Sequence, residues 1–167
     1  MIVTATRARA VIVALALLFL AAPLSMQAVA FSSGGNSSEG NDPDIRKGDA
    51  AVIERRFDEA LTSYMRALDR DPENADAWSQ TGFVHRKLGN FEKSLEAYQQ
   101  ALEIHPFHLG ANEYLGELYL QTDQVEKAEE MAAILRRACP TGCEELDALD
   151  SAIEAYRKSG GEVKWNK

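Results

Sequence analysis

Cys139 and Cys143, the two cysteines of the chain, are the residues whose type and spacing most clearly suggest chemistry. Only three residues, 140–142, separate them. In an oxidising compartment a pair this close favours a disulfide, which would close a very short loop and act as a structural staple. The alternative is a redox or metal-handling role, but thioredoxin-like sites have two residues between their cysteines and need a fold with strands. We therefore predict a disulfide between Cys139 and Cys143 and keep the redox or metal-handling accessory as the alternative.

A metal site would need more ligands than two thiolates, and His105 and His108 are the only plausible additions. They lie about 34 residues before the cysteines, in an earlier turn that we expect roughly 10 Å away, which makes a shared site awkward. The sequence contains no glycine-rich phosphate loop, no Gly-x-Ser-x-Gly elbow and no His-Glu-x-x-His motif. We predict no metal site, no cofactor, no catalytic residues and no enzyme activity.

The elements that position these residues follow a period of 34. Shifting the sequence by this length aligns three prolines and, independently, three glycines: Pro72, Pro106 and Pro140, and Gly48, Gly82 and Gly116. Other positions keep the same step: Phe57, Phe91 and Val125; Ala60, Ser94 and Ala128; Tyr64, Tyr98 and Ala132; Ala67, Ala101 and Leu135. This is a 34-residue repeat in which a small residue lets two helices approach and a proline ends each hairpin.

The repeat resembles that of the tetratricopeptide-repeat (TPR) family. The middle unit carries the family's signature residues Trp78, Gly82, Phe91, Ser94, Tyr98, Ala101 and Pro106. The resemblance implies an all-α helix-turn-helix solenoid of three repeats, 41–74, 75–108 and 109–142, followed by a capping helix at 143–158 and a tail at 159–167. The outer units depart from the pattern at Asp44 and Lys47, and at Asn112 and Ala132. The tail residue Trp165 is predicted to fold back onto the capping helix or to serve as a docking handle.

The resemblance also implies a concave groove lined by the first helix of each repeat, which binds an extended protein segment. The positions carried over are Ile45, Asp49, Val52, Asp76, Ser79, Phe83, Arg86, Lys87, Glu113, Glu117, Leu120 and Gln121. Phe83 would be an apolar anchor, with Arg86 and Lys87 as a basic centre between acidic flanks, so a peptide with an acidic middle would suit. The carboxylate clamp of the chaperone-binding subclass is not expected, because Ile45 and Asp49 occupy its basic and Asn positions. Idle, solvated charges and self-association through the first repeat remain alternatives.

The first thirty residues predict export. Arg7 and Arg9 precede an apolar run at 10–22 that is shorter than the roughly 20 residues of a membrane-spanning helix, and 28–30 reads Ala-Val-Ala, a cleavage site. We expect a signal peptide at 1–30, a flexible polar leader at 31–40, a periplasmic or secreted mature protein, and no stable membrane span after cleavage; an uncleaved anchor is the alternative. The formal charge of -8 disfavours nucleic acid as a partner, and a protein or extended peptide of the cell envelope is the predicted one.

Overall fold

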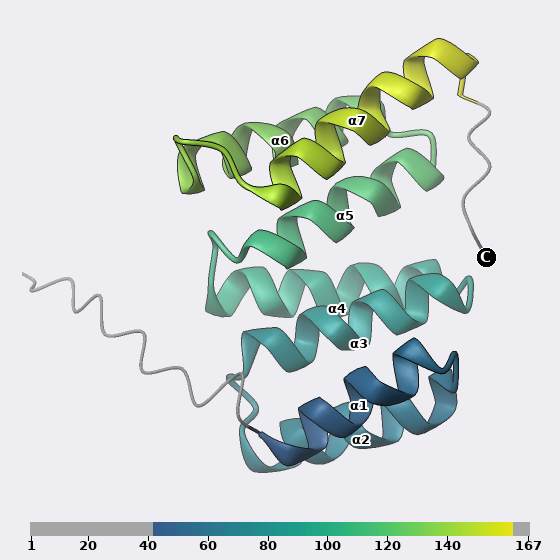
Figure 1. Cartoon of the computed structure of the whole chain (residues 1–167), viewed down its shortest axis with the longest axis vertical. Helices are drawn as coiled ribbons and strands as arrows, with labels where there is room; N and C mark the ends of the chain where they lie inside the picture. Colours follow the sequence, from purple (N-terminus) through teal and green to yellow (C-terminus); the bar gives the residue numbers. More distant parts are fainter. Residues whose placement is uncertain (1–41, 162–167) are drawn as a thin grey trace, which may run out of the picture. The chain divides into compact units, whose positions relative to one another are not determined.

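The computed structural model describes residues 42–161, and Figure 1 shows them as a stack of helix hairpins. This part of the chain contains seven α-helices and no strand. Their bounds are α1 Pro43–Ile53, α2 Phe57–Arg70, α3 Ala75–Lys87, α4 Phe91–Ile104, α5 Leu109–Gln121, α6 Val125–Ala138 and α7 Glu144–Ser159. The all-α helix-turn-helix solenoid expected from the sequence is confirmed, while the predicted signal peptide, the leader and residues 162–167 of the predicted tail lie outside the described residues.

The first helix of each hairpin starts at a capping side chain. Asp42 accepts hydrogen bonds from the backbone N–H of Asp44 at 2.7 Å and of Ile45 at 3.3 Å, and Asn74 accepts from Ala77 at 2.9 Å. In α5 the cap is His108, whose ring Nδ1 accepts from the N–H of Ala111 at 3.1 Å. Each cap satisfies a backbone donor that the helix itself leaves unpaired.

Glycine and tyrosine hold the first two hairpins together. A Cβ atom on Gly48 would overlap the ring of Tyr64, and one on Gly82 would lie 2.6 Å from the ring of Tyr98. Both tyrosines are fully buried. The two glycines therefore provide the space that each ring occupies, because any side chain there would overlap it.

The third hairpin fills this space differently. Its residue at the tyrosine position is Ala132, which is too small to reach Gly116. Leu149 of α7 takes the place of the ring, and a Cβ on Gly116 would lie 2.6 Å from its side chain. Leu149 is fully buried, and Leu146 and Ile153 of α7 are buried in the same cluster. The departure at Ala132 is thus compensated by α7, which closes the core.

Substitution of the two buried tyrosines by phenylalanine is expected to have unequal effects. The Tyr64 hydroxyl donates to Asp49 Oδ1 at 2.7 Å, whereas the Tyr98 hydroxyl has no hydrogen-bond partner of good geometry among the described residues, although the Arg86 guanidinium lies near it. Tyr64→Phe should lower the free energy of unfolding by about 1 kcal/mol, and Tyr98→Phe should change it by about zero. Urea titration of both variants measures the difference; an equal loss at both positions would show that the Tyr98 hydroxyl is paired in solution.

Within residues 42–161, no helix is both long and apolar enough to cross a membrane.

Candidate functional site

The first helices form one layer of the described unit. In Figure 1, α1, α3, α5 and α7 lie in front, and the second helices α2, α4 and α6 lie behind them. Within the front layer α3 contacts α5, and α5 contacts α7. Partly exposed side chains of different helices therefore come together on this face, as the groove prediction requires.

Arg86 lies at the centre of this face. Its side chain is only 5% exposed, and its Nη2 lies 2.5 Å from Glu117 Oε2 on α5. The guanidinium also lies 5.5 Å from the ring centre of Phe83 and 5.8 Å from that of Tyr114. The two rings are 5.1 Å apart, and the Lys87 Nζ lies 5.8 Å from the Phe83 ring. The result is a rigid cluster, the Arg86 cluster (Phe83, Arg86, Lys87, Tyr114 and Glu117), held by an ion pair and cation–π contacts.

Acidic side chains lie next to the Arg86 cluster, between α5 and α7. Glu113 is surrounded by Glu117, Glu145 and Glu144, and Glu117 forms the ion pair with Arg86. Burial and the neighbouring carboxylates raise the pKa of Glu113 from the ordinary 4.5 to about 7, against the opposing effect of Arg86. A cationic side chain of a partner would relieve this repulsion.

The raised pKa of Glu113 predicts a stability that falls with rising pH. The folded protein binds the Glu113 proton more tightly than the unfolded chain does, so protonation of Glu113 stabilises the folded state. This contribution to the free energy of unfolding is complete below about pH 4.5 and is lost as the pH rises through about 7. In Glu113→Gln this loss should disappear, so the variant should gain stability relative to the parent at pH 8 and much less at pH 5. Urea unfolding at both values tests this, with Glu126→Gln on the exposed face of α6 as the matched control. An equal pH dependence in parent and Glu113→Gln would contradict it.

The predicted groove residues divide into two groups. Those that are partly exposed on the front helices are Asp49, Val52, Asp76, Phe83, Lys87, Glu113, Glu117 and Gln121. Those that are buried are Ile45, Ser79 and Leu120, together with Arg86. For Ile45, Ser79 and Leu120 the expectation of a surface position is wrong, because their side chains pack inside the array; Arg86 is buried by the partners that make it the centre of the cluster.

Two of the partly exposed residues are engaged in the fold. Asp49 accepts the Tyr64 hydroxyl, and Asp76 Oδ1 lies 2.9 Å from His108 Nε2. The hydrogen bond with His108 lowers the pKa of Asp76, against the effect of its burial. These two carboxylates therefore fix the front helices more than they offer free acceptors to a ligand.

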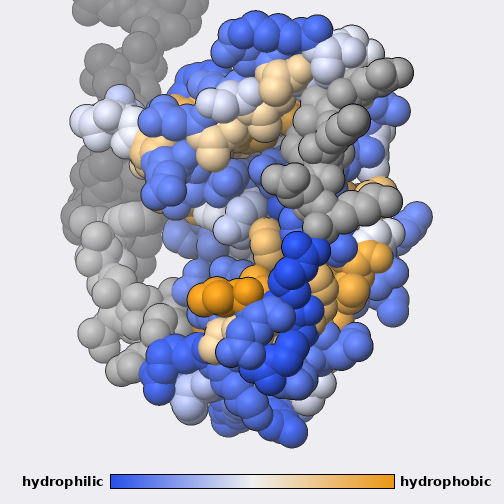
Figure 2. Space-filling model, turned by 45° about the vertical axis from the view of Figure 1, so that its right-hand side comes forward, coloured by the Kyte–Doolittle hydropathy of each residue, from blue (hydrophilic) through white to orange (hydrophobic). Residues whose placement is uncertain are grey.

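Several residues of this face were not found from the sequence. Tyr114 lies on α5 but was not among the groove positions carried over from the family, and Glu144 and Glu145 lie on α7, which is not part of the repeat. Ile53 is 82% exposed at the end of α1. It lies one 34-residue period before Lys87, so the repeat could have indicated its place on this face. Figure 2 shows one side of the molecule, which is mostly hydrophilic; the most strongly apolar groups lie in its lower half, where Figure 1 places the first hairpins, and paler apolar groups lie in its upper half.

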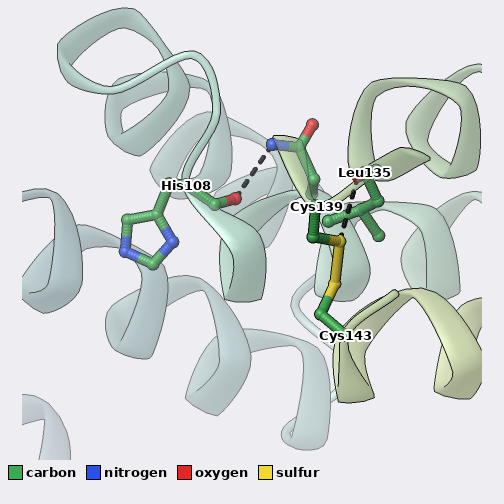
Figure 3. Close-up of a disulfide and its surroundings, with 5 residues drawn as sticks. His108, Leu135, Cys139 and Cys143 are labelled. Atoms are coloured by element: carbon green, nitrogen blue, oxygen red, sulfur yellow. Dashed lines mark hydrogen bonds between the residues drawn. A yellow bond between two sulfur atoms is a disulfide. The ribbon is translucent and has the colours of Figure 1, made fainter. Parts of the chain in front are cut away.

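The cysteine pair lies away from the Arg86 cluster, in the turn between α6 and α7. The two sulfur atoms are 2.11 Å apart, a disulfide distance (Figure 3). The backbone N–H of Cys139 donates to the Leu135 carbonyl at 2.8 Å, which ends α6, and Cys143 directly precedes α7. The pair thus lies where it can restrain the angle between the last two helices.

His108 is not available as a metal ligand beside these sulfur atoms. In Figure 3 its ring points away from both cysteines. Its Nδ1 accepts from Ala111, and its Nε2 faces Asp76. Residues 42–161 contain no group of three or more His, Cys, Asp or Glu side chains arranged to hold a metal ion.

Helix hairpins of similar length, stacked in sequence order and closed by one further helix, define a helical repeat solenoid. The chain belongs to the tetratricopeptide-repeat family: the family's sequence model matches residues 45–107 and 80–142, which together make up more than half of the 167 residues. The resemblance seen in the sequence is thereby confirmed.

The relatives match this chain over about half of its length. A tetratricopeptide repeat-containing protein of Caenorhabditis elegans, trd-1, is 28% identical over 81 residues, which cover 48% of this chain and 10% of that protein. The human protein O-mannosyl-transferase TMTC3 is 27% identical over 84 residues, covering 50% of this chain and 9% of that protein. Among solved structures, the TPR2B domain of yeast Sti1, in a pHsp70 complex, superposes with a TM-score of 0.64 at 16% identity over 70% of this chain and 94% of that one. The chain thus spans about a tenth of the length of these two relatives.

Proposed function

We propose that the protein is a non-catalytic adaptor that binds an extended protein segment across the face formed by α1, α3, α5 and α7. The observation that carries this proposal is the Arg86 cluster, in which Phe83, Lys87 and Tyr114 are held rigidly on helices and remain partly exposed. Preorganised aromatic and cationic side chains are the groups that carry binding energy at protein interfaces. The TPR domain of yeast Sti1 that shares this fold is described in a complex with pHsp70.

The charges of the face indicate what segment would fit. Lys87 and Phe83 favour an acidic or apolar side chain at the centre, and Ile53 offers an apolar contact beside the first repeat. The carboxylates of Glu113, Glu144 and Glu145 favour a basic side chain toward α7. The proposed ligand is therefore an extended segment with an acidic or apolar middle and a basic residue at the end that lies over α5 and α7.

Selection from a random peptide library on the purified mature chain tests this charge order. Sequences enriched on the parent protein should carry that pattern and should lose at least tenfold in affinity for Phe83→Asp. The matched control is Met65→Asp, an exposed apolar residue on the rear helix α2, which should keep the same affinity. Equal loss in both variants, or no enrichment, would count against the groove.

We further propose that the adaptor works outside the cytoplasm, in the periplasm or after secretion, and takes part in the assembly of envelope complexes. The support is the charged and apolar pattern of residues 1–30, described above. N-terminal sequencing of the protein recovered from an expressing cell should give Phe31 as the first residue. Recovery of the uncleaved chain from the cytoplasm would refute this part of the proposal.

In that oxidising compartment we expect Cys139 and Cys143 to be joined by a disulfide, as their Cα–Cα distance of 6.0 Å allows. Alkylation of the unfolded, unreduced protein should add no label, and alkylation after reduction should add two. A bond that exchanges rapidly with glutathione in the folded protein would instead favour the redox role.

A further inference from the structure

An apolar pocket opens between α4 and the turn that joins α5 to α6. Phe91 and Leu95 of α4 form one wall, and Leu118 and Tyr119 of α5 form the other. Its volume is about 140 Å³. Engineered protein cavities of about 150 Å³ bind a benzene ring, so the pocket has the size for one aromatic group. It is separate from the Arg86 cluster, since none of these four residues belongs to that cluster.

The described chain ends beside the mouth of this pocket. The rim residues Thr122 and Gln124 flank Asp123, and Asp123 Oδ1 accepts the Tyr156 hydroxyl of α7 at 3.1 Å. The same Oδ1 lies 3.9 Å from the position that a Cβ on Gly161 would take. Gly160 and Gly161 have φ angles of 68° and 96°, which turn the backbone out of α7 at this point. The segment that follows Gly161 therefore starts next to the rim.

The sequence after Gly161 supplies an occupant of matching chemistry. Residues 162–165 read Glu-Val-Lys-Trp, and in an extended conformation Val163 and Trp165 would lie on one side and Lys164 on the other. Trp165 is four residues beyond Gly161, a reach of about 14 Å when extended. The pocket offers opposite charges on its two sides: Glu92 on α4, and Lys127, whose Nζ lies 5.2 Å from the Tyr119 ring.

We propose that Trp165 inserts its indole ring into the pocket formed by Phe91, Leu95, Leu118 and Tyr119, so that the segment after α7 binds back across the second and third repeats. Burial of the indole removes apolar surface of both the ring and the pocket from water. The segment then ties α7 to α4 on the edge of the array and leaves the face with the Arg86 cluster open. The inference does not depend on the proposed groove function.

Fluorine NMR of the mature chain labelled with 5-fluorotryptophan tests this assignment. The chain has two tryptophans, Trp78 and Trp165, and Trp165→Phe assigns their signals. The Trp165 signal should differ from that of a labelled peptide of residues 159–167, and should move to the peptide position in Leu95→Asp. Leu88→Asp, at an exposed leucine after α3, is the matched control and should leave the signal in place.

A second variant keeps the test valid if Leu95→Asp fails to fold. Gln124→Phe adds a ring at the rim without removing a core side chain, and should also release Trp165 while the Trp78 signal stays unchanged. A Trp165 signal that coincides with the free peptide in the parent protein, or that is unaffected by both pocket variants, would overturn the proposal. A signal that changes with protein concentration would overturn it as well, because the occupied pocket would then belong to a second copy.

Discussion

Gly82→Ala is expected to destabilise the protein by about 2 to 3 kcal/mol. Replacing glycine by alanine inside a helix usually increases stability instead. The added Cβ would lie 2.6 Å from Cδ1 and Cε1 of Tyr98, a separation that requires something to move. The ring cannot move easily, because Tyr98 is fully buried and packs against α3 and α5. The clash should therefore exceed the helix-propensity gain of about 1 kcal/mol.

The matched control for this result is Gly110→Ala in α5. There the nearest atoms to an added Cβ lie 3.7 Å away, an ordinary contact, and the substitution should be neutral or slightly stabilising. Urea unfolding followed by circular dichroism gives both values. Equal stability of Gly82→Ala and Gly110→Ala would mean that the hairpin tolerates a wider helix separation, and that the period-34 glycines do not set the packing.

Arg86→Met is expected to be the most destabilising change on the front face, by about 2 to 4 kcal/mol. It removes the partner of Glu117 and leaves that carboxylate, 23% exposed, beside Glu113. It also removes the contacts of the guanidinium with Phe83 and Tyr114. The upper end of the range for breaking a buried pair is not expected, because Glu117 keeps some access to water.

The double variant Arg86→Met/Glu117→Gln distinguishes loss of the pair from loss of packing. If the uncompensated carboxylate causes most of the damage, the second substitution should recover at least half of the lost free energy of unfolding. Arg136→Met, which breaks an exposed pair with Asp150, is the control and should cost less than about 1 kcal/mol. A cost for Arg86→Met no larger than that of Arg136→Met would refute the buried pair as the centre of the site.

The positions of the helices could be predicted from the sequence because the pattern repeats. Gly48 and Gly82 recur with Tyr64 and Tyr98 at one period, and the structure packs each glycine against its own tyrosine. The third repeat could not be derived this way. Ala132 breaks the pattern, and its replacement, Leu149, comes from α7, which is not part of the repeat. A contact between a repeat and a non-repeated helix leaves no periodic signal.

The candidate site could be predicted in part. Phe83, Arg86 and Lys87 were found because their places in the repeat are those of the family's groove. The same reasoning placed Ser79 and Leu120 in the groove, but the structure buries both side chains. The position of a residue along one helix does not reveal how closely the next hairpin packs against it. The role of His108, which caps α5 through one ring nitrogen and faces Asp76 through the other, depends on a contact between two repeats and could not be read from spacing.

Photo-crosslinking in the cell tests the central claim, that the front face binds a protein segment. A photoreactive amino acid is placed at Phe83 within the Arg86 cluster or at Lys93, which is exposed on the rear helix α4 beside an open cleft of about 440 Å³. The adducts are identified by mass spectrometry. The account predicts one discrete partner captured from Phe83 and not from Lys93. Capture of the same partner from Lys93 alone, or equal capture from both positions, would contradict it.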